Sequence, residues 1–184
     1  MNFTQIPADA FDRLAVNAGV LLTQFDPESA VVSREDILGA TTGGVTVRCV
    51  PEYTDFGEDM DNCPKNMLQL RRLSGWECTL AGTLLTVDTA AAALLLGAAD
   101  TDADTQTVTP RARVAETDFH DLWYVCDYGT GGGFIAVRLK NALSTGGLSL
   151  QTADAGKGKL AFTFTGHSTM DDPDAVPMEF FLKK

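Results

Sequence analysis

The chain has 184 residues, 45% hydrophobic and 21% charged, which suits one globular domain with its own core. Its 25 acidic side chains outnumber its 14 lysines and arginines, and the resulting net charge of -11 argues against a surface that wraps nucleic acid. A wall of like charge would instead let a polyanion slide past without sticking to it.

The first seven residues have neither the basic segment nor the apolar core of a secretory signal peptide. No run approaches the roughly 18 apolar residues that are needed to span a bilayer. We therefore expect a soluble protein that is made in the cytoplasm and does not enter a membrane. The four cysteines show no Cys-x-x-Cys spacing and are expected to stay reduced: Cys49, Cys63, Cys78 and Cys126.

In chain order, residues 8–16 suggest a short helical turn and residues 19–25 a first strand. After the Thr- and Gly-rich segment 40–44, a clean alternation predicts a strand over 45–50. Val45, Val47 and Cys49 share its core face, whereas Thr46 and Arg48 share the opposite face.

Residues 51–64 contain five carboxylates, no basic residue and two aromatics, without a helical or strand period. Such an acidic segment gains little from burial, yet Tyr53 and Phe56 are too apolar to remain in water. We predict a protruding loop whose two rings dock on another surface, and the alternative is that they fold back onto their own domain.

A long strand is predicted over 75–87, and its two faces differ. One face is apolar and belongs to the core: Trp76, Cys78, Leu80 and Leu84. The other face is small and polar, and it faces solvent or a lumen: Glu77, Thr79, Ala81 and Thr83.

A helix follows over 88–97, with Asp88 as its N-cap and Gly97 as its stop. Because it is short, it must lie on the sheet through a buried stripe: Ala91, Leu94, Leu95 and Ala98. The Asp- and Thr-rich tract 100–107 is expected to be an exposed and mobile loop.

The second half is mainly strands, with glycine-rich turns at 129–133 and 153–158 that close two hairpins. The strands are expected over 122–128, 134–143, 147–152, 160–167 and 176–182. The predicted class is therefore mainly β: residues 1–184 form a single β-sandwich or partly closed barrel with one short flanking helix and a long protruding loop.

Carboxylate clusters imitate metal sites without completing one. Asp100, Asp102 and Asp104 resemble the start of a calcium loop, but Thr105 and Arg111 stand where the loop needs glycine and a bidentate glutamate. A second cluster, over 171–174, is interpreted as a solvated turn. We expect no metal and no cofactor.

Catalytic candidates are few. His120 and His167 lie in no nucleophile, zinc or phosphate-loop motif. Cys126 is near His120 in sequence but shares a strand face with apolar residues, so it is interpreted as core. The sequence does not favour an enzyme.

Two stretches, 39–47 leading into 51–59 and the strand from Trp76 to Asp88, resemble the tail tube (major tail) proteins of long-tailed bacteriophages and prophages. The resemblance is best over residues 36–96 and weaker over the closing strands. The helix and the 100–107 tract depart from the family pattern.

The resemblance implies a structural virion protein that forms hexameric rings, which stack into the hollow tail tube through which viral DNA is ejected. Its partners would be further copies of itself and the tape measure, baseplate and tail terminator proteins, and DNA would pass without specific binding. Loop 51–64 would make the contacts between rings, through Tyr53, Asp55, Phe56, Glu58, Asp59 and Asp61. The candidate lumen face would be Thr46, Arg48, Glu77, Thr79 and Thr83, with Arg48 pairing with Glu77 across strands.

Two other classes stay open. A monomeric β-sandwich binding module, such as a capsid decoration or adhesion domain, would use the same loop to hold a foreign partner. A tail terminator or baseplate protein would make single rings instead of a tube.

Overall fold

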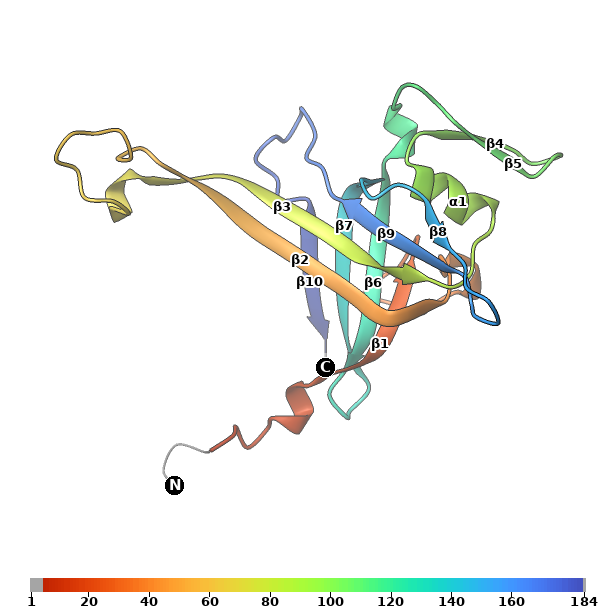
Figure 1. Cartoon of the computed structure of the whole chain (residues 1–184). Helices are drawn as coiled ribbons and strands as arrows, with labels where there is room; N and C mark the ends of the chain where they lie inside the picture. Colours follow the sequence, from red (N-terminus) through yellow and green to blue (C-terminus); the bar gives the residue numbers. More distant parts are fainter. Residues whose placement is uncertain (1–4, 184) are drawn as a thin grey trace.

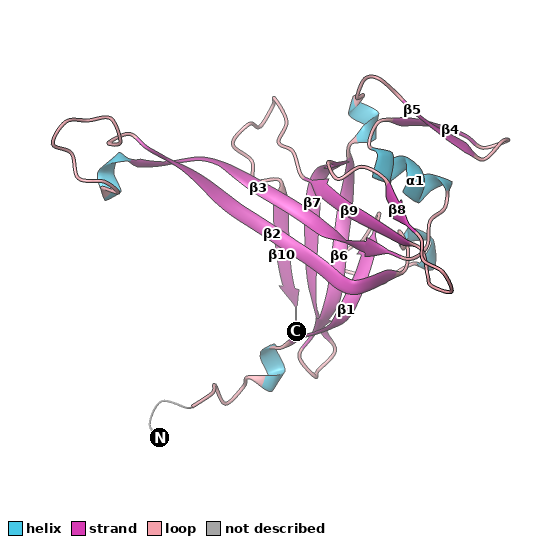
Figure 2. Ribbon diagram, viewed as in Figure 1, coloured by secondary structure: helices cyan, strands magenta, loops and turns pink. Residues whose placement is uncertain are grey.

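The computed structural model describes residues 5–183, so most of the first seven residues, analysed above for a signal peptide, lie outside it. Figure 1 shows a β-rich body with one long hairpin extending from it, and Figure 2 shows the predominance of strands. The elements are β1 (Ala15–Leu22), β2 (Thr41–Asp55), β3 (Arg71–Leu84), α1 (Thr89–Leu96), β4 (Ala99–Asp102), β5 (Thr107–Pro110), β6 (His120–Tyr128), β7 (Gly133–Ser144), β8 (Ser149–Gln151), β9 (Lys159–Thr165) and β10 (Met178–Lys183).

Eight of these strands form one antiparallel sheet in the order β1-β6-β7-β9-β3-β2, with β10 on β7 and β8 on β9. The sheet folds over into two layers because β7 pairs with β6 and β10 along most of its length but with β9 at Leu143 and Ser144. Strands β1, β6, β7 and β10 make the first layer, and β2, β3, β8 and β9 make the second, whose strands cross those of the first (Figure 1).

A β-bulge explains how β7 changes layers. The pairing of β6 with β7 shifts between His120↔Ala142 and Leu122↔Leu139, which places two residues of β7 opposite one of β6. One of the two, Asn141, has a positive φ of 46°, and its N–H donates to Asp121 (3.0 Å). Bulges bend a strand, and this one lies where β7 leaves the first layer for the second.

The main core lies between the two layers, as the alternating patterns predict. Leu80, Leu84 and Phe164 of the second layer are nearly inaccessible to solvent and meet residues such as Leu122 and Val137 of the first. The predicted face of the 45–50 strand is confirmed, because Val45 and Val47 pack against this core. Cys126 also lies in it, as predicted, and burial raises the pKa of its thiol.

A second, smaller apolar cluster on the outer face of the first layer was not predicted. Trp123 meets Phe25 edge-on with ring centroids 5.7 Å apart, and the ring of Phe181 of β10 also packs against Trp123 at 5.6 Å. The guanidinium of Arg138 lies 5.6 Å from the Trp123 ring and pairs with Asp121 and Glu179. This cluster fastens the segment after β1 to the sheet.

Helix α1 follows the prediction closely. The Asp88 carboxylate accepts the N–H of Ala91 (2.7 Å), and Gly97 ends the helix with a φ of 78°. Of the predicted stripe, Ala91 and Leu95 are fully buried against the core, and Leu94 packs beside them.

Several predicted boundaries were wrong. Residues 8–16 contain only a short 3-10 turn at Phe11–Arg13, and β1 begins earlier than expected because it pairs with β6 from Ala15. The tract 100–107 is a two-stranded hairpin, β4 with β5, and not an irregular loop. Its turn is held by the Asp102 carboxylate, which accepts the N–H groups of Asp104 (2.9 Å) and Thr105 (3.3 Å).

We predict that Phe164→Ala lowers the free energy of unfolding by about 3–5 kcal/mol, because it leaves a cavity between the layers. Phe180→Ala is the matched control, since that ring is 63% exposed, and it should change stability by no more than about 0.5 kcal/mol. Urea unfolding of dilute protein measures both. Equal losses for the two variants would contradict this assignment of the core.

Candidate functional site: the projecting hairpin

The most prominent feature of the surface is a two-stranded arm (Figure 1). Strand β3 pairs with β9 only over residues 79–84, whereas its pairing with β2 continues from Gly82↔Val45 to Arg71↔Asp55. Beyond the Cys49↔Cys78 pair, β2 and β3 therefore run on without a third strand and end in the connecting loop 56–70. We call residues 50–77 the arm and residues 56–70 its tip.

The prediction that 51–64 is an irregular loop is therefore wrong for residues 51–55, which belong to β2. The strand tolerates Pro51 because, at this position, a backbone N–H would not point toward β3. The Cys78 carbonyl accepts the N–H of Gly166 (3.0 Å), so Cys49↔Cys78 is a non-hydrogen-bonded pair, and so is Pro51↔Trp76 two residues on. The Pro51 nitrogen then faces the free edge of β2, where no donor is needed.

Asp55 organises the tip from within. Its carboxylate accepts the N–H of Gly57 (2.9 Å) and the N–H of Asn66 (3.0 Å), and these hydrogen bonds lower its pKa. The N–H of Phe56 donates to the Leu70 carbonyl (3.1 Å), which closes the neck of the tip. Asp55 was predicted to contact a neighbouring ring, but its oxygens are engaged inside its own loop.

The tip and stem leave large apolar side chains in water. Tyr53 is 51% exposed, Phe56 is 63% exposed and Leu68 is 84% exposed, so the first two do not fold back onto their own domain. The Arg71 guanidinium covers one face of the Tyr53 ring at 4.7 Å. Further exposed apolar residues of the arm are Met60, Met67, Leu73 and Trp76. Isolated exposed apolar residues are ordinary, but seven on one projection indicate a contact surface.

Three carboxylates of the tip, Glu58, Asp59 and Asp61, are exposed beside these apolar groups, as predicted. Leu68 and Met60 were not predicted, although they are 84% and 54% exposed. For Met60 the signal was available, since it lies in the same acidic segment as Phe56, whereas Leu68 lies beyond that segment, beside Met67 and Leu70.

The residues predicted to face a lumen do lie together, on the outer face of the second layer. Arg48 Nη1 pairs with Glu77 Oε2 across the strands (2.8 Å), as predicted. Thr46, Thr79 and Thr83 share this face, and the register adds two residues of β9 that were not predicted, Thr163 beside Ala81 and Thr165 beside Thr79. We call these residues the threonine face. Arg48, the cation in this set, is already paired with the Glu77 carboxylate.

Strand β10 offers a second unpartnered feature, a free backbone edge. In the described part of the chain β10 pairs with β7 alone, so its other edge has unused N–H and C=O groups. Phe180 is 63% exposed and Leu182 is 49% exposed, although the register places them on the same face of the first layer as the core residues Val137 and Ile135. An exposed edge strand with apolar side chains is a template for pairing with another chain.

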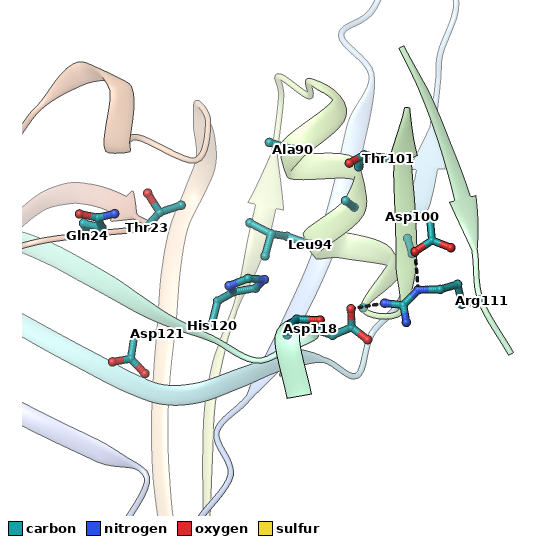
Figure 3. Close-up of a pocket in the computed structure, with 14 residues that line it drawn as sticks. Thr23, Gln24, Ala90, Leu94, Asp100, Thr101, Arg111, Asp118, His120 and Asp121 are labelled. Atoms are coloured by element: carbon teal, nitrogen blue, oxygen red, sulfur yellow. Dashed lines mark hydrogen bonds and ion pairs between the residues drawn. The ribbon is translucent and has the colours of Figure 1, made fainter. Parts of the chain in front are cut away.

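A pocket of about 650 Å³ lies between α1, β4 and the start of β6 (Figure 3). Its charged groups are engaged with each other: Arg111 pairs with Asp100 (2.8 Å) and with Asp118, which also accepts the Ala115 N–H (2.8 Å). The remaining carboxylate, Asp121, binds Arg138. His120 lines the pocket, but none of the hydrogen bonds among the described residues joins it to a carboxylate.

The other polar candidates have structural surroundings. His167 Nδ1 lies 3.1 Å from the Asn141 carbonyl oxygen, and its ring meets Phe119 edge-on at 5.2 Å. Asp100 and Asp102 bind Arg111 and the β4–β5 turn respectively. Among residues 5–183, His, Cys, Asp and Glu side chains form no group of three that could hold a metal ion.

The sequence matches no model of a known protein family, and a search of curated proteins finds no relative. Within residues 5–183, none of the helices has the length and apolar character needed to cross a bilayer.

We predict that Asp55→Ala loosens the tip without unfolding the body, because two backbone N–H groups lose their acceptor. Trypsin cleavage after Lys65 should become faster at neutral pH, whereas Asp59→Ala, which removes an exposed carboxylate of the same tip, should leave the rate unchanged. Equal cleavage rates for the wild type and Asp55→Ala would show that Asp55 does not order the tip.

The tip should also respond to acid. Because the pKa of Asp55 is lowered in the folded tip, its contribution is complete above the usual aspartate pKa of about 3.9 and is lost as the pH falls through the lowered value. Hydrogen-exchange protection of the Gly57 and Asn66 amides, corrected for the intrinsic pH dependence, should fall in that acid range. The amides of β6 should keep their protection there.

Proposed function

We propose that the protein is a structural virion subunit that assembles into rings, and that the rings stack into the tail tube of a long-tailed bacteriophage or prophage. The observation that carries this proposal is the arm, which extends from the body and exposes Tyr53, Phe56 and Leu68. Apolar side chains are stabilised by leaving water, and in the described part of the chain the fold leaves more than half of each of these three exposed, although Arg71 covers one face of the Tyr53 ring. A neighbouring ring of the same protein would supply the missing surface.

Assembly needs a lateral contact as well as an axial one. The free edge of β10, with Phe180 and Leu182 beside it, supports a ring in which strands of neighbouring subunits pair edge to edge. In the proposed assembly each subunit therefore uses β10 within its ring and the arm between rings. A ring of six is the number that the family resemblance implies.

The threonine face suits the wall of a DNA channel. Its side chains are uncharged, apart from the paired Arg48 and Glu77, so it offers phosphates no cluster of free cations. DNA would then pass without specific binding. The tape measure, baseplate and tail terminator proteins are the further partners that this role entails, with the assembled tail as the location.

We predict that Tyr53→Ala combined with Phe56→Ala leaves a folded subunit that no longer forms tubes, because the axial contact loses its two aromatic anchors. Circular dichroism checks the fold, and negative-stain microscopy of concentrated protein checks the assembly. Met170→Ala is the control, since that side chain is fully exposed and does not belong to the arm, and its tubes should be normal.

The same micrographs separate the alternatives. Tubes of normal length from the double variant would remove the arm from the assembly mechanism. Wild-type protein that stays a single particle at every concentration would favour a monomeric binding module, and isolated rings would favour a terminator or baseplate protein.

We also predict that assembly becomes stronger with salt. Six copies at -11 give a ring of roughly -66, and screening of this self-repulsion favours association. Light scattering between about 0.05 M and 0.5 M sodium chloride should show a falling critical concentration. A critical concentration that rises with salt would indicate that attraction between opposite charges dominates the contacts.

A further inference from the structure

Two cysteines face each other at the root of the arm. Cys49 of β2 and Cys78 of β3 are directly opposite in the strand register, and their Sγ atoms are 3.0 Å apart as free thiols. The pairing of β3 with β9 ends at Thr79, and the Cys78 carbonyl accepts one more N–H, that of Gly166, so this pair lies directly before the two-stranded arm begins. From the sequence all four cysteines were expected to stay reduced, and no pairing between two of them was predicted.

The backbone at this pair has the geometry that a disulfide requires. Because Cys49↔Cys78 is a non-hydrogen-bonded pair, its Cα atoms approach to about 4.5 Å, which falls within the range of about 4.4–6.8 Å that disulfides span. Both side chains are on the core face of the second layer, so they point the same way from their strands. A bond between the two sulfurs therefore needs no movement of either strand.

The two thiols differ in access, which sets the order of reaction. Cys49 is exposed, whereas Cys78 is completely buried, and burial raises the pKa of Cys78 to about 12. Cys49 is therefore the sulfur that a reagent in solution meets first, and Cys78 is placed to react second.

We propose that Cys49 and Cys78 form a redox-modifiable site, which closes to a cross-strand disulfide on reaction with a low-molecular-weight disulfide such as oxidised glutathione. The Cys49 thiolate attacks one sulfur of glutathione disulfide, forming a mixed disulfide and releasing one glutathione thiolate. The Cys78 thiolate then attacks Cys49 Sγ, forming the protein disulfide and releasing the second glutathione. Two protein thiols are oxidised, one glutathione disulfide is reduced, and the two protons pass to the glutathione thiolates.

The bond would tie β2 to β3 where the arm leaves the body and would enclose the whole arm in one covalent loop. In a reducing compartment the thiols persist, and the loop closes in oxidising surroundings. Cys63 and Cys126 lack this arrangement, since Cys63 Sγ contacts Pro64 O and Met67 Sδ in the tip and Cys126 lies in the core. The inference rests on the geometry of the hairpin and does not depend on tube formation.

The test treats the full-length protein with oxidised glutathione and then cleaves the exposed tip after Lys65 with trypsin. On a non-reducing denaturing gel the two fragments should stay together, and a reducing gel should separate them. The intact protein should lose about 2 Da, and closure should speed up by about tenfold per pH unit between about pH 7 and pH 9, because Cys78 must lose its proton. Peptide mapping should identify a link from Cys49 to Cys78.

Two variants keep the outcome unambiguous. Cys49→Ser changes an exposed side chain and should leave the fragments separate on the non-reducing gel, whereas Cys63→Ser should behave like the wild type. The proposal is overturned by a stable glutathione adduct on Cys49, by unchanged thiols after prolonged treatment, or by a link through Cys63.

Discussion

The arm depends on a register that the body imposes. A two-stranded hairpin alone is only marginally stable in water, and the arm has no third strand and few buried contacts. Where β3 also pairs with β9, however, Leu80 and Leu84 are locked into the core, and a slip of one residue would turn them out to solvent. The body therefore fixes how β2 and β3 meet, and the pairing continues outward to Asp55 and Arg71. At the far end of the arm, the hydrogen bonds of the Asp55 carboxylate to Gly57 and Asn66 hold the connecting loop in place.

The second layer separates two surfaces with opposite properties. Its inner face supplies Leu80, Phe162 and Phe164 to the core, and its outer face carries the threonine face, in which Arg48 is paired with Glu77, together with the exposed Lys159 of β9. Along β2, β3 and β9 successive residues point to opposite faces of the sheet, so a substitution on one face need not disturb the other face. In the proposed tube this division lets the bore carry little charge while the subunit as a whole carries -11.

Much of the fold could be predicted because alternation is local. The core positions of Val45, Val47, Cys78, Leu80 and Leu84, the helix between Asp88 and Gly97, and the glycine-rich hairpins follow from neighbours in the sequence. Trp76, which was also predicted for the core, is instead 37% exposed on the arm, and the strand predicted to reach residue 87 ends at Leu84. Residues 51–55 were missed because Pro51, Glu52 and Asp55 have weak strand propensity, and pairing with β3 overrides it. The bulge at Asn141 and the meeting of Cys49 with Cys78 depend on which strands pair and in which register. The alternation of side chains within one strand does not reveal which strands pair or in which register.

The sharing of β7 between the layers has a mechanical consequence. A pull on the arm along its axis passes from β2 and β3 into β9, then through the end of β7 into the first layer and β10. A force parallel to the strands loads their hydrogen bonds in shear, so that many bonds must break together. A force perpendicular to the strands would instead peel them apart and break the bonds one by one. Tension applied at the tip would thus be distributed across the sheet to the edge strand on the other side of the molecule.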